Sequence, residues 1–273
     1  HDAESLYVSA PAGAGKSTFC RWAALQSIDG TGELAHPVAA PDEYAEPPPT
    51  NLRDRLPLLV PLREFTPGMR CGRGAQTWCR AELEGALAGW VDRSPSATDP
   101  ALPGLTGALL RAHLKAGSAF LLLDGLDEVP ISAKHADWDV FPRELLVSGL
   151  ADALPAWRKA GNRILLTSRP YGLEETGLHR LGLPEAPLEP LPQPLQELFV
   201  RRWFHTLRKP EKAPTLIATV HDRDVLEPLV ENPLLLTALC VLHDTGGRLP
   251  EDRRELYDRI VNNVLFHRFP GDM

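Results

Sequence analysis

The feature that most constrains this chain is a glycine-bearing string that separates an apolar stretch from a helical pattern. The string is Ala10-Pro11-Ala12-Gly13-Ala14-Gly15-Lys16-Ser17-Thr18. Residues 6–8 before it are typical of a short buried strand, and residues 17–26 are typical of a helix. Glycines let backbone N–H groups close around phosphate oxygens at the start of a helix. The order strand, glycine loop, helix predicts a phosphate-binding loop of the Walker A type, with Ala10 in the place of the first glycine.

The residues of this loop have separate expected roles. Lys16 is expected to reach the β and γ phosphates of a nucleoside triphosphate, and Ser17 to offer its hydroxyl to Mg²⁺. The other expected phosphate contacts are Ala12, Gly13, Ala14, Gly15 and Thr18. A flexible Gly/Ala turn is the alternative interpretation. The strand before the loop and the helix after it count against that alternative.

A second motif, Phe120-Leu121-Leu122-Leu123-Asp124-Gly125-Leu126-Asp127-Glu128, has the character of a Walker B element. A buried strand ending in Asp124 would hold this carboxylate rigidly in the Mg²⁺ shell. Asp127 and Glu128 are the candidates to orient or deprotonate the attacking water, and we prefer Glu128. Taken alone, the string could be an acidic turn after a core strand. Its occurrence together with the glycine loop favours one shared magnesium-phosphate site.

A third apolar stretch, residues 163–166, leads into Thr167-Ser168-Arg169-Pro170. Polar residues at the carboxyl end of a strand in an open α/β sheet lie where ligands bind. Arg169 is therefore expected to sense the γ-phosphate, and Thr167 or Ser168 to hydrogen-bond water. A surface arginine in a proline-closed turn is the alternative.

Strands and helices alternate along the first two thirds of the chain. Strands are expected at 6–8, 58–65, 119–123, 163–167 and 187–191, and helices at 17–26, 77–91, 105–115 and 141–160. Beyond residue 192 only helical stretches remain, at 196–207, 216–220, 232–243 and 251–269. The pattern predicts an α/β fold of the P-loop NTPase class, a three-layer αβα arrangement with a five-stranded parallel sheet, over residues 1–192. A small all-helical lid domain is expected over residues 193–273, and the proline-rich stretch 37–57 is expected to be an exposed excursion.

Composition argues against several classes of protein. The chain has 273 residues, of which 43% are hydrophobic, so a large core is possible. A formal net charge of −7 argues against general binding of nucleic acid or anionic membrane. No apolar run approaches the length of a membrane span, and the four cysteines lack CxxC spacing, so we expect a cytoplasmic protein. Because the chain begins at His1 and its first strand starts almost at once, we expect a fragment of a longer protein.

The sequence resembles the NACHT branch of the STAND nucleotide switches, the class that includes NOD-like immune receptors. The resemblance rests on the strings DGLDE at 124–128, TSRP at 167–170, LEPL at 188–191, ENPLLL at 231–236, LP at 249–250 and RELY at 254–257. It implies that the Arg169 strand lies between the Walker A and Walker B strands. It also implies that Pro233 packs against the adenine and that the helices after Pro192 form a lid.

The resemblance further implies a bacterial ATP/ADP-binding switch with slow, regulated ATPase activity. Its nucleotide state would control the opening and oligomerisation of a larger protein in innate immunity or antiviral defence. The implied partners are the sensor and effector domains of the parent chain and further copies of itself, without a membrane or direct nucleic-acid contact. The alternatives are a nucleotide-dependent oligomerisation scaffold with negligible turnover and an AAA+-like ATPase. Gly125 stands where an AAA+ motor usually has its catalytic glutamate, which counts against the second alternative.

Overall fold

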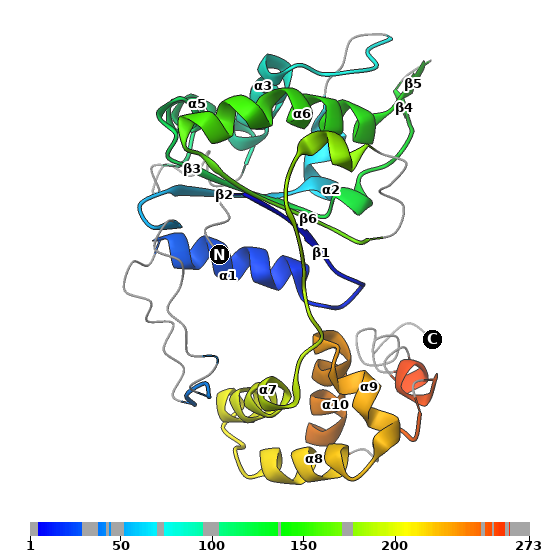
Figure 1. The fold of residues 1–273 in the computed structure, drawn as a ribbon. Coiled ribbons are helices and arrows are strands. Elements are labelled where there is room, and N and C mark those ends of the chain that lie inside the picture. The colour runs from blue at the N-terminus through cyan, green and yellow to red at the C-terminus, as the bar shows by residue number, and fades with distance from the viewer. Residues whose placement is uncertain are drawn as a thin grey trace. The chain divides into compact units, whose positions relative to one another are not determined.

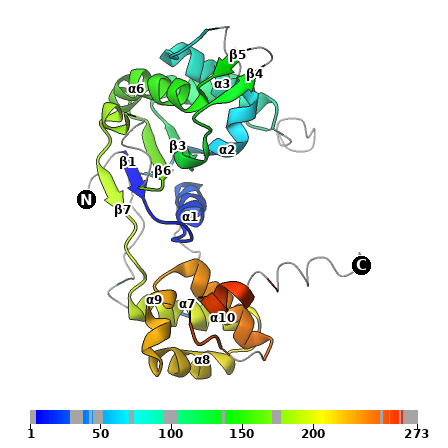
Figure 2. The same cartoon turned by 90° about the vertical axis from the view of Figure 1, so that its right-hand side faces the viewer.

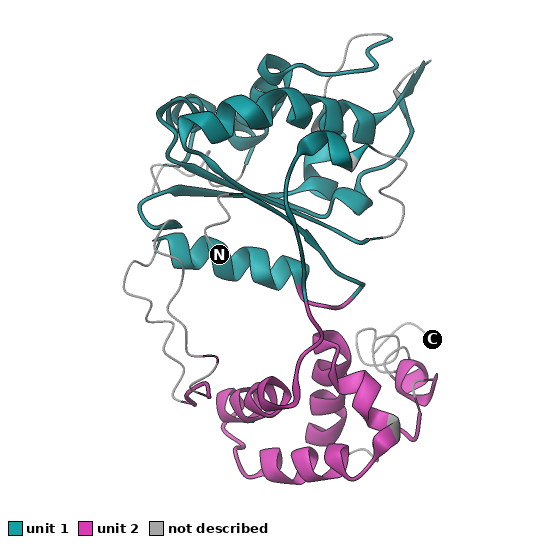
Figure 3. Ribbon diagram, viewed as in Figure 1, with its two compact units in different colours: residues 1–12, 16–32, 48–188 teal, residues 13–15, 33–47, 189–273 magenta. Residues whose placement is uncertain are grey.

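A computed structural model describes residues 5–28, 38–41, 44, 52–69, 74–94, 104–135, 138–170, 177–246, 249–252, 254–259 and 262. The chain divides into two compact units (Figure 3). The first comprises residues 1–12, 16–32 and 48–188, and the second comprises residues 13–15, 33–47 and 189–273. The domain boundary expected at residue 192 stays a prediction.

The first unit is built on a five-stranded parallel sheet (Figures 1 and 2). Its strands are β1 (Leu6–Ser9), β2 (Leu56–Pro61), β3 (Ala119–Asp124), β6 (Arg163–Ser168) and β7 (Glu185–Pro187), in the spatial order β2-β3-β6-β1-β7. Leu165 of β6 pairs with Leu6 on one side and with Leu122 on the other. The strand order therefore confirms that the Arg169 strand lies between the Walker A and Walker B strands.

Helices cover both faces of this sheet (Figure 1). One face carries α1 (Lys16–Ile28), and the other carries α3 (Arg80–Asp92), α5 (Gly107–Ala116) and α6 (Pro142–Ala160). In β3, Leu121 and Leu123 belong to the core beneath α3, α5 and α6, whereas Phe120 and Leu122 belong to the core beneath α1. A strand buried on both faces needs this continuous apolar sequence. The result is the expected three-layer αβα fold of a P-loop NTPase.

The helix ends follow local sequence signals. Thr106 caps α5, because its Oγ1 accepts a hydrogen bond from the Leu109 N–H at 3.2 Å. Gly117 ends the same helix with a φ of 74°, a left-handed conformation that glycine adopts without strain. The helix α6 starts with Pro142 in its first turn and ends at Gly161, whose φ is 109°.

Two expected strands differ in the structure. The strand expected over 58–65 ends at Pro61, and Leu62–Phe65 instead forms the short helix α2, with both of its terminal residues buried. The fifth strand, β7, covers Glu185–Pro187 rather than 187–191. Pro187 and Pro190 lack the N–H that a longer paired strand would require. An antiparallel pair, β4 (Ala133–His135) and β5 (Trp138–Val140), had no counterpart among the expected strands.

The second unit is helical in its described part. Its helices are α7 (Gln193–Thr206), α8 (Lys212–His221), α9 (Glu227–Val230) and α10 (Pro233–Asp244). They enclose a core that includes Phe204, Leu216 and Leu239. Residues 254–259 are also helical, and most of the remaining helix expected over 251–269 lies outside the described residues. Over the described residues of the whole chain, every helix is too short or too polar to cross a bilayer.

Candidate phosphate-binding site

The structure gathers side chains from the carboxyl ends of three neighbouring strands. Lys16 follows β1, Asp124 ends β3, and Arg169 follows β6. Burial lowers the pKa of Lys16, while the nearby carboxylates of Asp127, Asp124 and Glu128 act in the opposite direction and Arg169 adds to the lowering. One lysine therefore interacts electrostatically with every charged residue that the sequence predicted for this site.

The Lys16 ammonium lies against the first residues of its own loop. Its Nζ donates to the carbonyl oxygens of Ala10 at 2.8 Å and Pro11 at 3.1 Å. Lys16 is also the first residue of α1, whose first-turn N–H groups have no acceptor within the helix. Ser17 and Thr18, in the same turn, are exposed. The loop thus presents an ammonium group, a hydroxyl group and unpaired helix donors together, which suits an anion.

The three residues Gly13–Gly15 belong to the second unit, and within that unit they pack with the start of α10. The Leu234 N–H donates to the Gly13 carbonyl oxygen at 3.2 Å. A Cβ on Gly13 would lie 2.8 Å from Asn232 Oδ1, and Gly13 has a φ of 78°, so a larger residue is excluded for two reasons. Pro233, the predicted adenine contact, would lie with its Cγ 4.0 Å from a Cβ on Gly15.

A buried threonine joins the ends of β3 and β6. Thr167 Oγ1 donates to Asp124 Oδ1 at 2.6 Å and accepts from the Gly125 N–H at 2.9 Å. Thr167 is 0% exposed, and its partners here are the Asp124 carboxylate and the Gly125 N–H; the expected hydrogen bond of Thr167 or Ser168 to water stays a prediction. The Cys20 thiol of α1 lies 4.0 Å from Asp124 Oδ1. Burial, and next the charge of Asp124, raise the pKa of Cys20 to about 12.

Asp127 is held by the end of β6. Its Oδ1 accepts from Ser168 Oγ at 3.2 Å and from the Arg169 N–H at 3.0 Å. Its Oδ2 lies 3.1 Å from Arg169 Nε in an ion pair. Both oxygens of this carboxylate are therefore engaged by donors from a single neighbouring strand end.

Glu128 has different surroundings. It is exposed, and its Cγ and Cδ would lie 3.4 Å from a Cβ placed on Gly125. It lines a cavity of about 470 Å³ together with residues from the α2 region, among them Arg63 and Met69. Gly125 has a φ of 82°, a left-handed conformation that glycine adopts without strain in the turn after β3.

One residue of this region was missed from the sequence. Arg143, in the first turn of α6, donates from Nε to the Val129 carbonyl at 2.8 Å and from Nη2 to the Asp127 carbonyl at 3.0 Å. Arg143 belongs to no sequence motif. Its partners are backbone carbonyl groups, which every residue type has, so they leave no pattern in the sequence. The tertiary fold alone identifies it.

The donor set fits a magnesium ion that is bound together with a nucleotide. Within the described ranges, no three His, Cys, Asp or Glu side chains gather to hold a metal by themselves. Mg²⁺ commonly takes only one or two protein ligands and completes its shell with phosphate oxygens and water. The carboxylate of Asp124 and the hydroxyl of Ser17 are oxygen ligands of the kind such a site uses.

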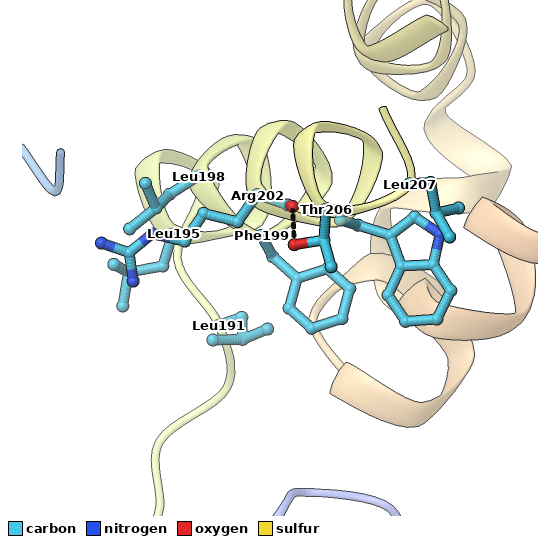
Figure 4. A pocket seen from close by; sticks show the side chains of 8 residues that line it. Leu191, Leu195, Leu198, Phe199, Arg202, Thr206 and Leu207 are labelled. Carbon is cyan, nitrogen blue, oxygen red and sulfur yellow. Dashed lines mark hydrogen bonds between the residues drawn. The ribbon is translucent and has the colours of Figure 1, made fainter. Parts of the chain in front are cut away.

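A separate apolar groove of about 510 Å³ follows α7 in the second unit (Figure 4). Phe199 and Trp203 stack on one another with ring centroids 6.1 Å apart and line it together with Leu191. Thr206, one of its few polar residues, donates its hydroxyl to the Arg202 carbonyl of the same helix at 2.9 Å, as the dashed line in Figure 4 marks. None of the residues predicted for the phosphate site lines this groove.

Comparisons with known proteins leave the family of the chain open. No family model matches the chain, and no curated protein matches it. Among solved structures, the Aeropyrum pernix ORC1 protein in complex with DNA is similar, with 15% sequence identity and a TM-score of 0.41. That alignment covers 95% of this chain and 59% of the other, so the chain spans less than two thirds of that protein's length. At this level of similarity, functional conclusions have to come from the fold and from the geometry of the site.

Proposed function

We propose that this chain is the nucleotide-binding module of a STAND-type ATP/ADP switch of the NACHT kind. The observation that carries the proposal is the convergence of Lys16, Asp124 and Arg169 at the ends of three adjacent parallel strands. In open α/β sheets this edge is where phosphate ligands bind. Three motifs that are far apart in the sequence thus meet at one edge of the sheet.

The residues of the site have distinct proposed roles. The backbone of residues 12–18 surrounds the phosphates, and Lys16 provides a positive charge to the β and γ phosphates. Ser17 and Asp124 hold Mg²⁺, which when bound neutralises phosphate charge. Thr167 fixes the orientation of Asp124 through its 2.6 Å hydrogen bond. Pro233 contacts the adenine, as the NACHT resemblance implies.

A switch needs contacts that ATP makes and ADP does not. Reversing a 1:99 equilibrium between two states takes about 5.5 kcal/mol of differential binding. Charge-assisted hydrogen bonds to the γ-phosphate are the strongest contacts available for this purpose. Lys16 and Arg169 are the cations proposed to make them, and Arg169 would exchange Asp127 for phosphate oxygens.

Hydrolysis is proposed to use Glu128 to orient or deprotonate water. Both carboxylate oxygens of Asp127 are already engaged, Oδ1 by two hydrogen bonds and Oδ2 by the ion pair with Arg169, so water would have to compete with these partners. Glu128 is exposed and adjoins a cavity. We therefore assign Asp127 to holding Arg169, and Glu128 to slow, regulated ATP hydrolysis.

The module is proposed to work within a longer cytoplasmic protein of innate or antiviral defence. Sensor and effector domains of that parent chain are its proposed partners, and the ATP form is proposed to self-assemble. The net charge of −7 favours a role without direct nucleic-acid or membrane contact. A nucleotide-dependent scaffold with negligible turnover and an AAA+-like ATPase are the competing functions.

The test is nucleotide binding by the full chain, with Lys16→Ala as the variant and Lys115→Ala as the control. Lys115 is an exposed residue in the last turn of α5, outside the site. Calorimetry with ATP or ADP in the presence of Mg²⁺ should show affinity weakened by about 100-fold or more in Lys16→Ala, because several charge-assisted contacts are lost. Lys115→Ala should bind like the wild type. Retained affinity in Lys16→Ala would reject the site.

Phosphate release separates the switch from the scaffold. Chain loaded with ATP and followed through a single turnover should release phosphate slowly if the module hydrolyses ATP. Bound ATP that stays intact over hours would favour the scaffold. Identification of the nucleotide that copurifies with the chain would complement this measurement, since retained ADP supports a locked switch.

A further inference from the structure

The turn that carries Asp127 and Glu128 is short and is stabilised by few internal hydrogen bonds. It consists of one three-residue 3₁₀ turn, Leu126–Glu128, entered through Gly125. Its internal hydrogen bonds run from the Glu128 N–H to the Gly125 carbonyl at 3.0 Å and from the Val129 N–H to the Leu126 carbonyl at 3.2 Å. Short 3₁₀ segments have poor hydrogen-bond geometry, so such a turn depends on support from its surroundings.

Arg143 supplies much of that support from α6. Its Nε donates to the Val129 carbonyl at 2.8 Å, and its Nη2 donates to the Asp127 carbonyl at 3.0 Å. Its own backbone N–H donates to the Pro130 carbonyl at 3.2 Å. The planar guanidinium group presents its donors in a fixed geometry to two of these carbonyls, and the backbone N–H of the same residue binds the third.

These contacts restrain the backbone on both sides of Glu128. The Asp127 carbonyl belongs to the peptide group before Glu128, and the Val129 carbonyl belongs to the second peptide group after it. Arg143 therefore limits the direction in which the Glu128 side chain leaves the backbone, without contact to its carboxylate. The support is rigid, because α6 is a 19-residue helix with a fully buried face that includes Leu145 and Leu146.

The turn is held on its other side by β6. Ser168 and Arg169 bind the Asp127 side chain, whereas Arg143 binds the Asp127 carbonyl. Burial lowers the pKa of Arg143, and the charge of Asp127 opposes that change. The guanidinium group is thus partly withdrawn from water and directed at the turn.

We propose that Arg143 is a positioning residue that sets the orientation of Glu128 toward the attacking water, a role that rests on the proposed ATP hydrolysis. Positioning within a fraction of an ångström strongly affects the rate of a reaction step and has little effect on ground-state binding. Loss of Arg143 should therefore lower kcat and leave nucleotide affinity nearly unchanged.

The chain offers a matched control at the opposite end of the same strands. Arg55 is also half-buried, and its Nη1 donates to two backbone carbonyls, those of Gly117 at 2.9 Å and Gly161 at 2.6 Å. Gly117 precedes β3 and Gly161 precedes β6, so Arg55 binds backbone at the amino ends of the strands. Arg55→Met and Arg143→Met remove the same kind of interaction from the same unit.

Steady-state ATP hydrolysis by the full chain is the first measurement. Arg143→Met should lose about tenfold or more in kcat, as expected for a misplaced general base, with nucleotide affinity changed less than about threefold. Arg143→Lys should keep part of the rate that Arg143→Met loses, since one charged donor nitrogen remains in place of two. Arg55→Met should keep the wild-type kcat at temperatures where it is folded. Equal kcat losses in Arg143→Met and Arg55→Met would overturn the proposal, because they would indicate a general loss of stability.

A double-mutant cycle tests whether Arg143 acts through Glu128. In a Glu128→Gln background, Arg143→Met should cause little further loss of kcat, because the group that it positions has already been disabled. Multiplicative losses would overturn the proposal. The pH dependence of kcat gives a further test. The profile should lose its acidic limb in Glu128→Gln and should be shifted along the pH axis in Arg143→Met. An unshifted profile in Arg143→Met would overturn the proposal.

Hydrogen exchange in the absence of nucleotide tests whether Arg143 stabilises the turn, independently of ATP hydrolysis. The amides of Glu128 and Val129 should exchange faster in Arg143→Met than in the wild type, and at wild-type rates in Arg55→Met. If the wild type shows no ATP hydrolysis, the proposed function fails while this measurement still decides whether Arg143 holds the turn. Unchanged exchange in Arg143→Met would overturn the proposal even in an active ATPase.

Discussion

Arg169 is bound twice by the carboxylate of Asp127. Its Nε lies 3.1 Å from Oδ2, and its backbone N–H donates to Oδ1 at 3.0 Å. The Arg169 side chain is 50% exposed, so the ion pair itself contributes at most about 1 kcal/mol. The hydrogen bond from its backbone N–H fixes the position of the residue, while the guanidinium group can exchange its partner with little loss of free energy. This combination supports the proposed role of Arg169 as a sensor of the γ-phosphate.

Replacement of Arg169 should affect ATP and ADP differently. Arg169→Ala should weaken ATP binding by about tenfold and change ADP binding less than about twofold, because one charge-assisted hydrogen bond to the γ-phosphate is lost. Calorimetry with both nucleotides measures the difference. Arg180→Ala is the control, since Arg180 forms an exposed ion pair with Glu144 at 2.9 Å elsewhere in the same unit. An equal loss for ATP and ADP would show that Arg169 does not read the γ-phosphate.

The two carboxylates of the turn should separate in function. Glu128→Gln should keep nucleotide affinity and lower single-turnover phosphate release by about 100-fold, the usual range for removal of a general base. Asp127→Asn should lower that rate less than Glu128→Gln does. It should change the ratio of ATP affinity to ADP affinity more, because it removes the ion-pair partner of Arg169. Quench-flow and calorimetry on both variants give the comparison. The reverse pattern would assign the base to Asp127.

Loss of the buried Thr167 hydroxyl should destabilise the first unit. Thr167→Val leaves the Gly125 N–H and one lone pair of Asp124 without their partner, at a cost of about 1–3 kcal/mol. Thr66→Val serves as the control, because Thr66 directly follows α2 and its hydroxyl donates to the Leu62 carbonyl of that helix, a local contact that joins no two strands. Urea unfolding followed by circular dichroism measures both variants. Equal and small losses in the free energy of unfolding would mean that the Thr167 hydroxyl, which links β3 and β6, contributes little to stability.

The described cysteines should differ sharply in reactivity. Cys20 and Cys240 are 0% exposed, and burial raises the pKa of each to about 12, whereas Cys79 is exposed. A thiol with a pKa near 12 is ionised to only about 1 part in 10⁴ at pH 8. Iodoacetamide at pH 8 should therefore modify Cys79 first, and Cys20 and Cys240 only on unfolding, as peptide mass spectrometry can follow. Modification of Cys20 at the rate of Cys79 would contradict the packing of α1 on the sheet.

The same pKa shifts predict a loss of stability in alkali. Folding favours the neutral thiols of Cys20 and Cys240, since their folded pKa lies above the ordinary thiol value of 9.0. This contribution is complete below pH 9 and is lost as the pH rises toward 12, because the unfolded state releases its protons first. The melting temperature should fall over this range, and less steeply in Cys240→Ala. A parallel fall in the variant would assign the alkaline loss to other groups.

Much of the fold could be predicted because its signals are local. An apolar run such as 119–123 can be read as a buried strand without knowledge of its neighbours, and β3 indeed covers Ala119–Asp124. The errors fell where local patterns were ambiguous. Leu62 and Phe65 continued an apolar strand pattern, yet the chain turned into α2, which buries both of them.

The candidate site divides in the same way. The sequence alone determined which residue types carry the chemistry, since the spacing of Lys16 within its loop and of Asp124 at a strand end follows from covalent order. Tertiary structure alone decided their partners: Thr167 for Asp124, Arg169 for Asp127, and Arg143 for the backbone around Glu128. These side-chain contacts join residues between 14 and 43 positions apart along the chain, and two of the three partners bind across from one strand end to another. A sequence motif reflects which side chains a ligand would require at a fixed spacing. The hydrogen bonds to a carboxylate or a carbonyl depend instead on which helices and strands the order of the sheet brings together.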